Sequence, residues 1–179
     1  KGNSNDAIKK ANETIEFHKS IIAELGLNSE SEFLIFFKKL TQELLLFLST
    51  GPKENDDFSY SKIVSFGELF STLIISSYLK KEGLKNRWID ARNLIKTSNQ
   101  YLDSKVNWKE TKIEINSIID ENITYVSQGF IGANQMRETT TLGREGSDFT
   151  AAIFAWCLDS NEVIIWKDVD GLLNADPKY

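Results

Sequence analysis

Cysteine and histidine are almost absent from this chain of 179 residues, which has one of each, Cys157 and His18. No disulfide can form within the chain, which fits a reducing compartment, and we expect a cytoplasmic protein. Zinc sites built from these ligands and Ser–His or Cys–His catalysis are nearly excluded. Because Cys157 lies in an apolar stretch, residues 151–158, we expect a buried structural thiol. Any chemistry must therefore use carboxylates, lysine, arginine and hydroxyl groups, with any metal bound by oxygen atoms.

Prolines, basic residues and long apolar runs are also scarce. Two prolines leave no proline-rich linker, and the length suits one domain. The 21 Lys and Arg residues are outnumbered by 26 Asp and Glu, for a net charge of −5, so no nucleic-acid partner is expected. No segment, the apolar run at residues 44–48 included, is expected to be long and apolar enough to span a membrane, and the polar first residues form no signal peptide. We therefore expect no membrane partner.

Hydrophobic periodicity predicts helices in the first half of the chain and alternating elements in the second. The helices are expected over residues 4–25, 30–48, 60–81, 107–119 and 148–158. Short strands are expected over residues 88–90, 124–131 and 163–166. This order indicates an α/β fold with a mostly parallel sheet covered by helices. In such folds ligands bind beyond the carboxyl ends of the strands, here after Ile131 and Trp166.

The run Leu-Gly-Arg-Glu-Gly-Ser-Asp at residues 142–148 is the most informative motif. Gly143 and Gly146 flank an arginine and a glutamate, and Ser147 and Asp148 open an apolar helical stretch. A glycine-containing loop before a helix directs free backbone N–H groups and the positive helix end at one point, which predicts an anionic ligand. Arg144 could bind a carboxylate or phosphate through two hydrogen bonds. The loop matches neither the Walker A pattern nor the dinucleotide fingerprint.

Further segments of the chain also carry polar groups. Glu68 follows Gly67 near the front of an apolar helix and either complements the helix dipole or holds a cationic ligand group. Residues 128–132 end a strand with two glycines, and three threonines follow at 139–141. Two aspartates, Asp168 and Asp170, follow the last strand, but glycine stands at the wrong position for a calcium loop. A turn at residues 174–178 ends in a lysine that could reach phosphate.

Taken together, these blocks resemble aspartokinase. The resemblance rests on Ser-Phe-Gly-Glu at residues 65–68, on residues 128–132 with 139–148, and on residues 165–171 with 175–178. It implies the amino acid kinase fold, a three-layer α/β/α sandwich. It also implies transfer of a phosphoryl group from ATP, with Mg²⁺, to the side-chain carboxylate of L-aspartate. That reaction opens the biosynthesis of lysine, threonine and methionine, and a homodimer is the family's expected state.

The resemblance also assigns a role to each matching residue. Glu68 corresponds to the glutamate that holds the substrate ammonium, Arg144 to the arginine that clamps its α-carboxylate, and Phe130 to a pocket wall. Gly146 and Ser147 belong to the segment that closes around substrate, and Ser147 and Asp148 are the catalytic pair, Asp148 positioning a phosphate-binding lysine. No protein ligand to a metal is assigned. The ATP-binding positions are Lys167, Asp168, Leu173, Asn174, Asp176 and Lys178.

The chain departs from the family pattern at four positions. Glu145 stands where many members have glycine, Lys167 where threonine is common, Leu173 where a tyrosine packs on the base, and Lys178 where arginine is common. A lysine offers phosphate a point charge in place of a two-pronged contact.

The family's early Lys-Phe-Gly-Gly-Thr-Ser turn, whose lysine contacts the transferring phosphate, has no match here. The expected organisation is therefore a partial catalytic domain: a helical region (1–58), an aspartate-binding part (59–132) and the start of a nucleotide-binding part (133–179), without regulatory ACT domains. We expect little or no activity from these residues alone, because phosphoryl transfer depends on positioning and charge. Two alternatives stay open: a non-catalytic relative that binds amino acid or nucleotide, and a kinase of the same fold for another amino acid.

Overall fold

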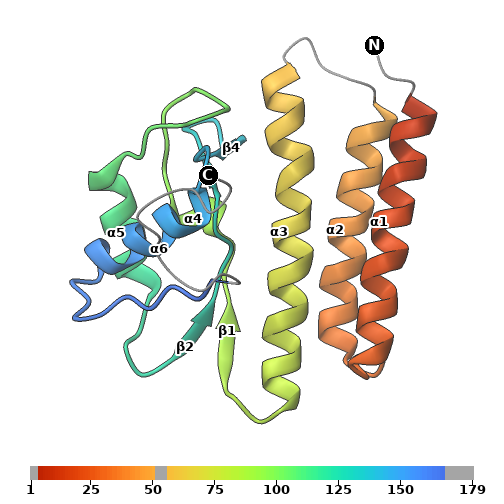
Figure 1. Ribbon diagram of the computed structural model, residues 1–179, viewed down its shortest axis with the longest axis horizontal. Helices are drawn as coiled ribbons and strands as arrows, with labels where there is room; N and C mark the ends of the chain where they lie inside the picture. The colour runs from red at the N-terminus through yellow and green to blue at the C-terminus, as the bar shows by residue number, and fades with distance from the viewer. Residues whose placement is uncertain (1–3, 51–55, 168–179) are drawn as a thin grey trace, which may run out of the picture.

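Three long helices form one side of the protein. The computed structural model describes residues 4–50 and 56–167. Helices α1 (Ser4–Glu24), α2 (Ser31–Ser49) and α3 (Asp56–Lys81) lie side by side (Figure 1). Gly26, at φ 64°, makes the left-handed turn that ends the first helix, as its position after the apolar stripe predicts. The structure begins α3 four residues earlier than the sequence pattern indicates.

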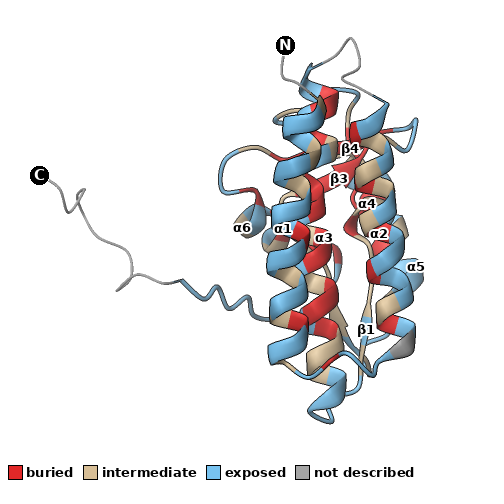
Figure 2. Ribbon diagram, turned by 90° about the vertical axis from the view of Figure 1, so that its right-hand side faces the viewer, coloured by how far each residue is buried: buried red, intermediate tan, exposed pale blue. Residues whose placement is uncertain are grey.

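Helix α3 is the central element of the core. Its Phe66, Leu69 and Phe70 are at most 1% exposed, and the Phe70 ring lies 5.1 Å from that of Phe37 on α2. Figure 1 places α3 between α1 and α2 on one side and the strands on the other, and Figure 2 shows its buried residues facing inward. Because α3 is contacted from both sides, its apolar residues are not confined to one stripe.

By length and composition, α3 could cross a membrane. The expectation that no segment is long and apolar enough is therefore wrong for this helix. Its buried Leu69, Phe70 and Ile74 pack inside the protein, against neighbouring helices and strands. A helix that is apolar on most sides is also what the core of a globular domain requires, and the packing of α3 fits that explanation.

The other side of the protein is α/β. It contains β1 (Asn86–Trp88), α4 (Ala91–Leu94), α5 (Trp108–Ile118), β2 (Thr124–Val126), β3 (Ile131–Ala133), β4 (Thr139–Thr141) and α6 (Gly146–Cys157). Strands β1 and β2 pair in parallel, and β3 and β4 form an antiparallel hairpin. Figure 1 shows the strands between α3 and the pair α5 and α6. The predicted α/β class is confirmed, with helices on both sides of the two small sheets.

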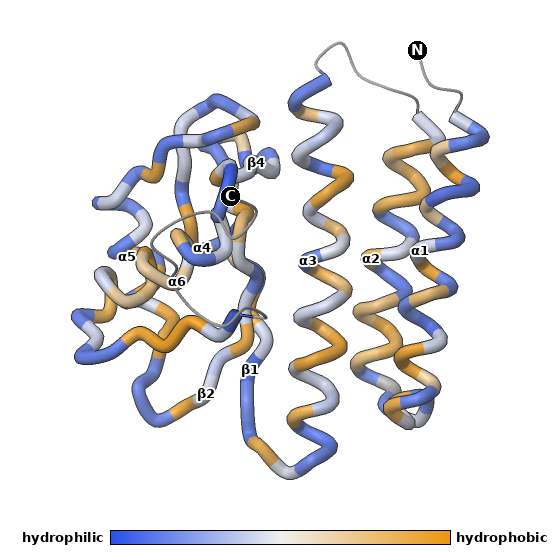
Figure 3. Tube along the Cα trace, viewed as in Figure 1, coloured by the Kyte–Doolittle hydropathy of each residue, from blue (hydrophilic) through white to orange (hydrophobic). Residues whose placement is uncertain are grey.

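All three predicted strands differ from the structure. The strand expected over 88–90 lies two residues earlier, as β1 (Asn86–Trp88). The strand expected over 124–131 is divided into β2 and β3, because Phe130 adopts a left-handed backbone (φ 70°) that interrupts extended structure. The strand expected over 163–166 is absent: no described strand pairs with these residues, and Trp166 is 90% exposed. Figure 3 shows this apolar stretch running away from the end of α6. Hydrophobicity favours a strand, but a strand also requires a hydrogen-bonding neighbour.

Candidate functional site

The loop from β4 to α6 has the geometry of an anion site. Glu145 precedes the helix in a left-handed conformation (φ 55°), and its side chain makes no capping hydrogen bond. No described group accepts from the backbone N–H groups of Ser147 and Asp148, which point out of the first helical turn. A left-handed backbone favours glycine, which gives a physical reason for the glycine that the aspartokinase pattern has at the position of Glu145.

The turn after β2 holds this loop in place. A Cβ atom on Gly129 would lie 2.9 Å from the Cα of Ser147, and one on Gly146 would lie 3.1 Å from the Cα of Phe130. The carbonyl of Phe130 accepts a hydrogen bond from the amide of Leu142 (2.8 Å). Backbone therefore meets backbone at both glycines. The position of Ser147 at the helix start depends on there being no side chain at Gly129.

Charged groups of opposite sign surround the loop. The Nζ of Lys167 lies 2.6 Å from Asp148 and 3.6 Å from Glu145, and its hydrogen bond to Asp148 raises the pKa of Lys167. The side chain of Arg144 is 95% exposed, and among the described residues it pairs only with Glu145, at a long 3.9 Å. Arg144 is thus free to bind an anion. Lys167 also places a second positive charge near the two free amides.

Glu68 lies half-buried on α3. Burial raises the pKa of Glu68, and no hydrogen bond or ion pair to its carboxylate exists among the described residues. A half-buried acid without a partner suits a cationic ligand group. The carbonyl of Glu68 accepts from the hydroxyl of Thr72 (2.8 Å), which in turn accepts from the side-chain amide of Gln128 (2.7 Å). These hydrogen bonds connect the helical turn that contains Glu68 to Gln128, which directly precedes the glycine turn that supports the loop at residues 142–148.

Sequence reasoning missed the role of Gln128. Its side chain is 1% exposed, donates to Thr72 and accepts from the backbone amide of Ala91 (2.8 Å). It joins α3, the start of α4 and the glycine turn at the end of β2. Its place directly before Gly129 was visible in the sequence, but nothing in the pattern indicates that both ends of the amide would find partners.

A cleft of about 500 Å³ opens beside these groups. Ser147, Gln128 and Gly129 line one part of it, and apolar side chains such as Ile89 and Phe154 line another. An apolar wall with a few polar groups is typical of small-molecule sites. Of the predicted site residues that the structure describes, Ser147 lines this cleft, Gly146 packs against Phe130, and Lys167 pairs with Asp148. Five predicted nucleotide positions lie outside the described residues: Asp168, Leu173, Asn174, Asp176 and Lys178.

Comparison with known proteins gives consistent matches. The sequence profile of the amino acid kinase family matches residues 8–179. The aspartokinase of Chlamydia muridarum is 34% identical over 170 residues, which cover 91% of this chain and 36% of that protein. Lysine-sensitive aspartokinase 3 of Escherichia coli is 34% identical over 135 residues, covering 73% and 29%. The crystal structure of E. coli aspartokinase III with aspartate and ADP aligns with a TM-score of 0.87 at 25% identity, covering 99% of this chain and 40% of that one. The chain thus spans well under half the length of these relatives.

Proposed function

Because this chain belongs to the amino acid kinase family, we propose that its protein transfers a phosphoryl group from ATP to the side-chain carboxylate of L-aspartate, forming 4-phospho-L-aspartate. The observation that carries the proposal is the loop at 142–148. It combines two helix amides without a described acceptor, an exposed arginine whose ion pair with Glu145 is long, and the Asp148–Lys167 pair. The aspartate and ADP in the related E. coli structure support the same choice of substrates.

Aspartate would be held by its two ends. The guanidinium of Arg144 would bind the α-carboxylate through two parallel hydrogen bonds, and the carboxylate of Glu68 would accept from the ammonium. Phe130 would form a wall of the amino-acid pocket, and Gly146 leaves room for its ring: a Cβ there would lie 2.8 Å from the ring atom Cδ2. Glutamate is one methylene longer. A site that engages both groups would therefore place its side-chain carboxylate wrongly for transfer.

The transfer itself would depend on positioned charge. One oxygen of the aspartate side chain attacks the γ-phosphorus, and the bond from phosphorus to the β-phosphate oxygen breaks, releasing ADP. The amides of Ser147 and Asp148 and the ammonium of Lys167 would stabilise negative charge on the phosphoryl oxygens. Asp148 would keep Lys167 protonated and in place, as their 2.6 Å contact indicates.

Magnesium belongs to the proposal as a companion of ATP. The described residues include no group of three or more acids, histidines or cysteines that could hold a metal. The ion would therefore be bound mainly by phosphate oxygens, as Mg²⁺ often is, and would screen their negative charge. A homodimer and a cytoplasmic location are further parts of this proposal, and the free, buried Cys157 agrees with a reducing compartment.

The test is ADP release by the full-length protein, followed in a coupled assay with aspartate and, in parallel, with glutamate. Turnover that depends on aspartate and is at least ten times slower with glutamate supports the proposal. Turnover with glutamate alone would identify a kinase for another amino acid. Binding of aspartate without ADP release would support a non-catalytic relative.

The pH dependence of substrate binding tests the role of Glu68. Its carboxylate must be ionised to hold an ammonium, and its pKa is raised by burial. We expect the KM for aspartate to increase as the pH falls through this raised pKa, by up to about tenfold per pH unit below it. Initial rates between pH 4.5 and 8 measure this effect. In Glu68→Gln the KM for aspartate should be high at every pH, and its dependence on pH should vanish. If the KM of that variant depends on pH as it does in the unmodified protein, the titrating group is not Glu68.

A further inference from the structure

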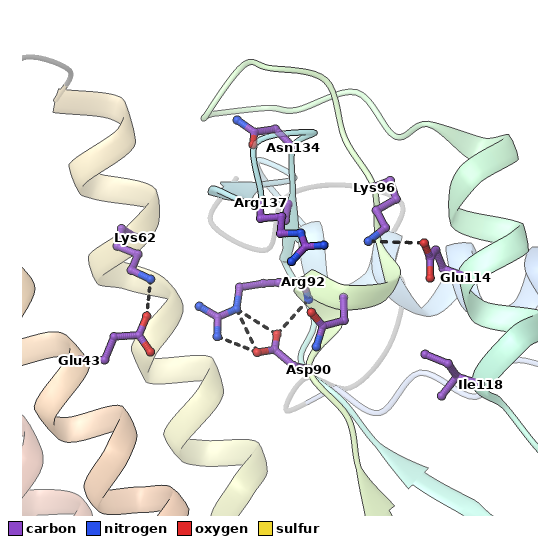
Figure 4. A pocket seen from close by; sticks show the side chains of 11 residues that line it. Glu43, Lys62, Asp90, Arg92, Lys96, Glu114, Ile118, Asn134 and Arg137 are labelled. Carbon is purple, nitrogen blue, oxygen red and sulfur yellow. Dashed lines mark hydrogen bonds and ion pairs between the residues drawn. The ribbon is translucent and has the colours of Figure 1, made fainter.

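A second cleft, of about 520 Å³, lies between the helices α2 and α3 and the α/β side of the protein (Figure 4). Charged side chains from helices α2, α3, α4 and α5, from the residues flanking α4 and from the β3–β4 turn dominate its lining. Four are cationic and three are carboxylates, an excess of one positive charge in a chain whose net charge is −5. They are Lys62, Arg92, Lys96 and Arg137, with Glu43, Asp90 and Glu114. None of these residues belongs to the site proposed for aspartate and ATP.

The carboxylates neutralise only part of this positive charge. Asp90 accepts from the Nε and Nη2 of Arg92 at 2.6 to 3.1 Å, which leaves Nη1 with a single long contact to a threonine hydroxyl (3.5 Å). Lys96 has a loose ion pair with Glu114, at 3.8 Å. No described residue makes a hydrogen bond or ion pair with the side chain of Arg137. Figure 4 shows Arg92, Lys96 and Arg137 around the same cleft.

A well-ordered turn sets the position of Arg137. Asn134 is 3% exposed, and its side-chain oxygen accepts from the backbone amides of Met136 and Glu138, each at 3.0 Å. The side-chain amide of Asn134 also donates to the carboxylate of Glu138 (3.1 Å). Arg137 itself has a left-handed backbone (φ 60°), which costs a non-glycine residue about 1 kcal/mol. The turn therefore holds the backbone of the unpaired arginine at the mouth of the cleft.

We propose that this cleft binds a small molecule carrying at least two anionic groups, carboxylate or phosphate. One group would be bound by the guanidinium of Arg137, and another by Lys96 and the weakly engaged Nη1 of Arg92. The cleft volume lies in the range of small-molecule sites, about 300–1,000 Å³. The site is separate from the loop of Arg144, so it would hold a ligand in addition to the substrates of the proposed reaction.

Calorimetric titration of the full-length protein with citrate, succinate and pyrophosphate, at constant ionic strength, tests this site. We expect saturable binding of at least one of the three probes. Carboxylate and phosphate ligands are distinguished by which probe binds most tightly. Arg137→Ala should weaken that binding about ten- to a hundredfold, because it removes hydrogen bonds to a charged group. Arg137→Lys should retain part of it.

Two variants locate the binding. Lys85→Ala removes an exposed positive charge from the turn between α3 and β1, and should leave the Kd unchanged. Arg144→Ala should also leave it unchanged, although it removes the arginine of the substrate loop. Unfolding temperatures should match across the set, since the Arg137 side chain has no described partner to lose. Absence of saturable binding, equal affinity in Arg137→Ala, or loss of binding in Arg144→Ala would each overturn the assignment. None of these results would affect aspartate turnover as a test of the proposed function.

Discussion

Replacing Arg144 by alanine is expected to lower kcat/KM for aspartate by about a hundred- to a thousandfold in the full-length protein. The side chain is almost fully exposed, and its ion pair with Glu145 is long, so the folded protein loses little when it is removed. The proposed complex loses two charge-assisted hydrogen bonds to the α-carboxylate. Coupled-assay kinetics and aspartate titration measure the loss, with the unfolding temperature as the control for folding.

Arg144→Lys separates charge from geometry. Lysine keeps the positive charge but cannot form two parallel hydrogen bonds, so we expect an intermediate loss. Arg87→Ala is the matched control, because Arg87 is also an exposed arginine and lies on β1, away from the loop. An Arg144→Ala protein with normal kcat/KM would exclude the arginine from substrate recognition, and the proposal would lose its main support.

Replacing Gly129 by alanine is expected to lower kcat/KM about a hundredfold, although Gly129 itself is not assigned to substrate binding. The added Cβ would lie 2.9 Å from the Cα, Cβ and Oγ of Ser147, so the start of α6 must move. A displacement of about 1 Å at a catalytic group can cost about a hundredfold in rate. The crowding should also reduce the free energy of unfolding by about 1–3 kcal/mol. Chemical denaturation and steady-state kinetics provide the two measurements.

Gly67→Ala is the matched control for stability. A Cβ at Gly67 meets nothing within 4 Å, and the residue lies inside α3. Alanine is the better helix former, so stability should increase by about 0.5–1 kcal/mol. If Gly129→Ala keeps full activity while stability falls, the loop tolerates displacement, and Ser147 is not held in a catalytically required position.

The loop at residues 142–148 was predictable from the sequence because its features are local. Glycines, an arginine and a Ser-Asp pair before an apolar run indicate a turn and a helix start within seven residues, and the structure begins α6 at Gly146. The left-handed conformation of Glu145 follows from the same turn. The apolar patterns of α1, α2, α3 and α5 were predictable for a similar reason, since each depends on spacing along one segment.

Other parts of the site depend on contacts between distant segments. Gln128 contacts Thr72 and Ala91, and no pattern near residue 128 specifies either partner. The division of the predicted strand at Phe130 follows from packing against Gly146, which comes sixteen residues later. The charged cleft has the same origin, because Lys62, Arg92 and Arg137 come from three separate segments.

The sequence by itself determined the longer helices and the glycine-containing loop at residues 142–148, because each depends on residue types at short, regular spacing. Its resemblance to aspartokinase supplied the residues of the proposed aspartate clamp. Only the tertiary structure decided that α3 is a core helix, that Gln128 connects the turn of Glu68 to the loop, and that Lys167 reaches Asp148. It also decided that residues 163–166 lack a described strand partner. The physical reason is that burial, hydrogen-bond partners and ion pairs between distant residues are set by how the segments pack, and one segment cannot specify its neighbours.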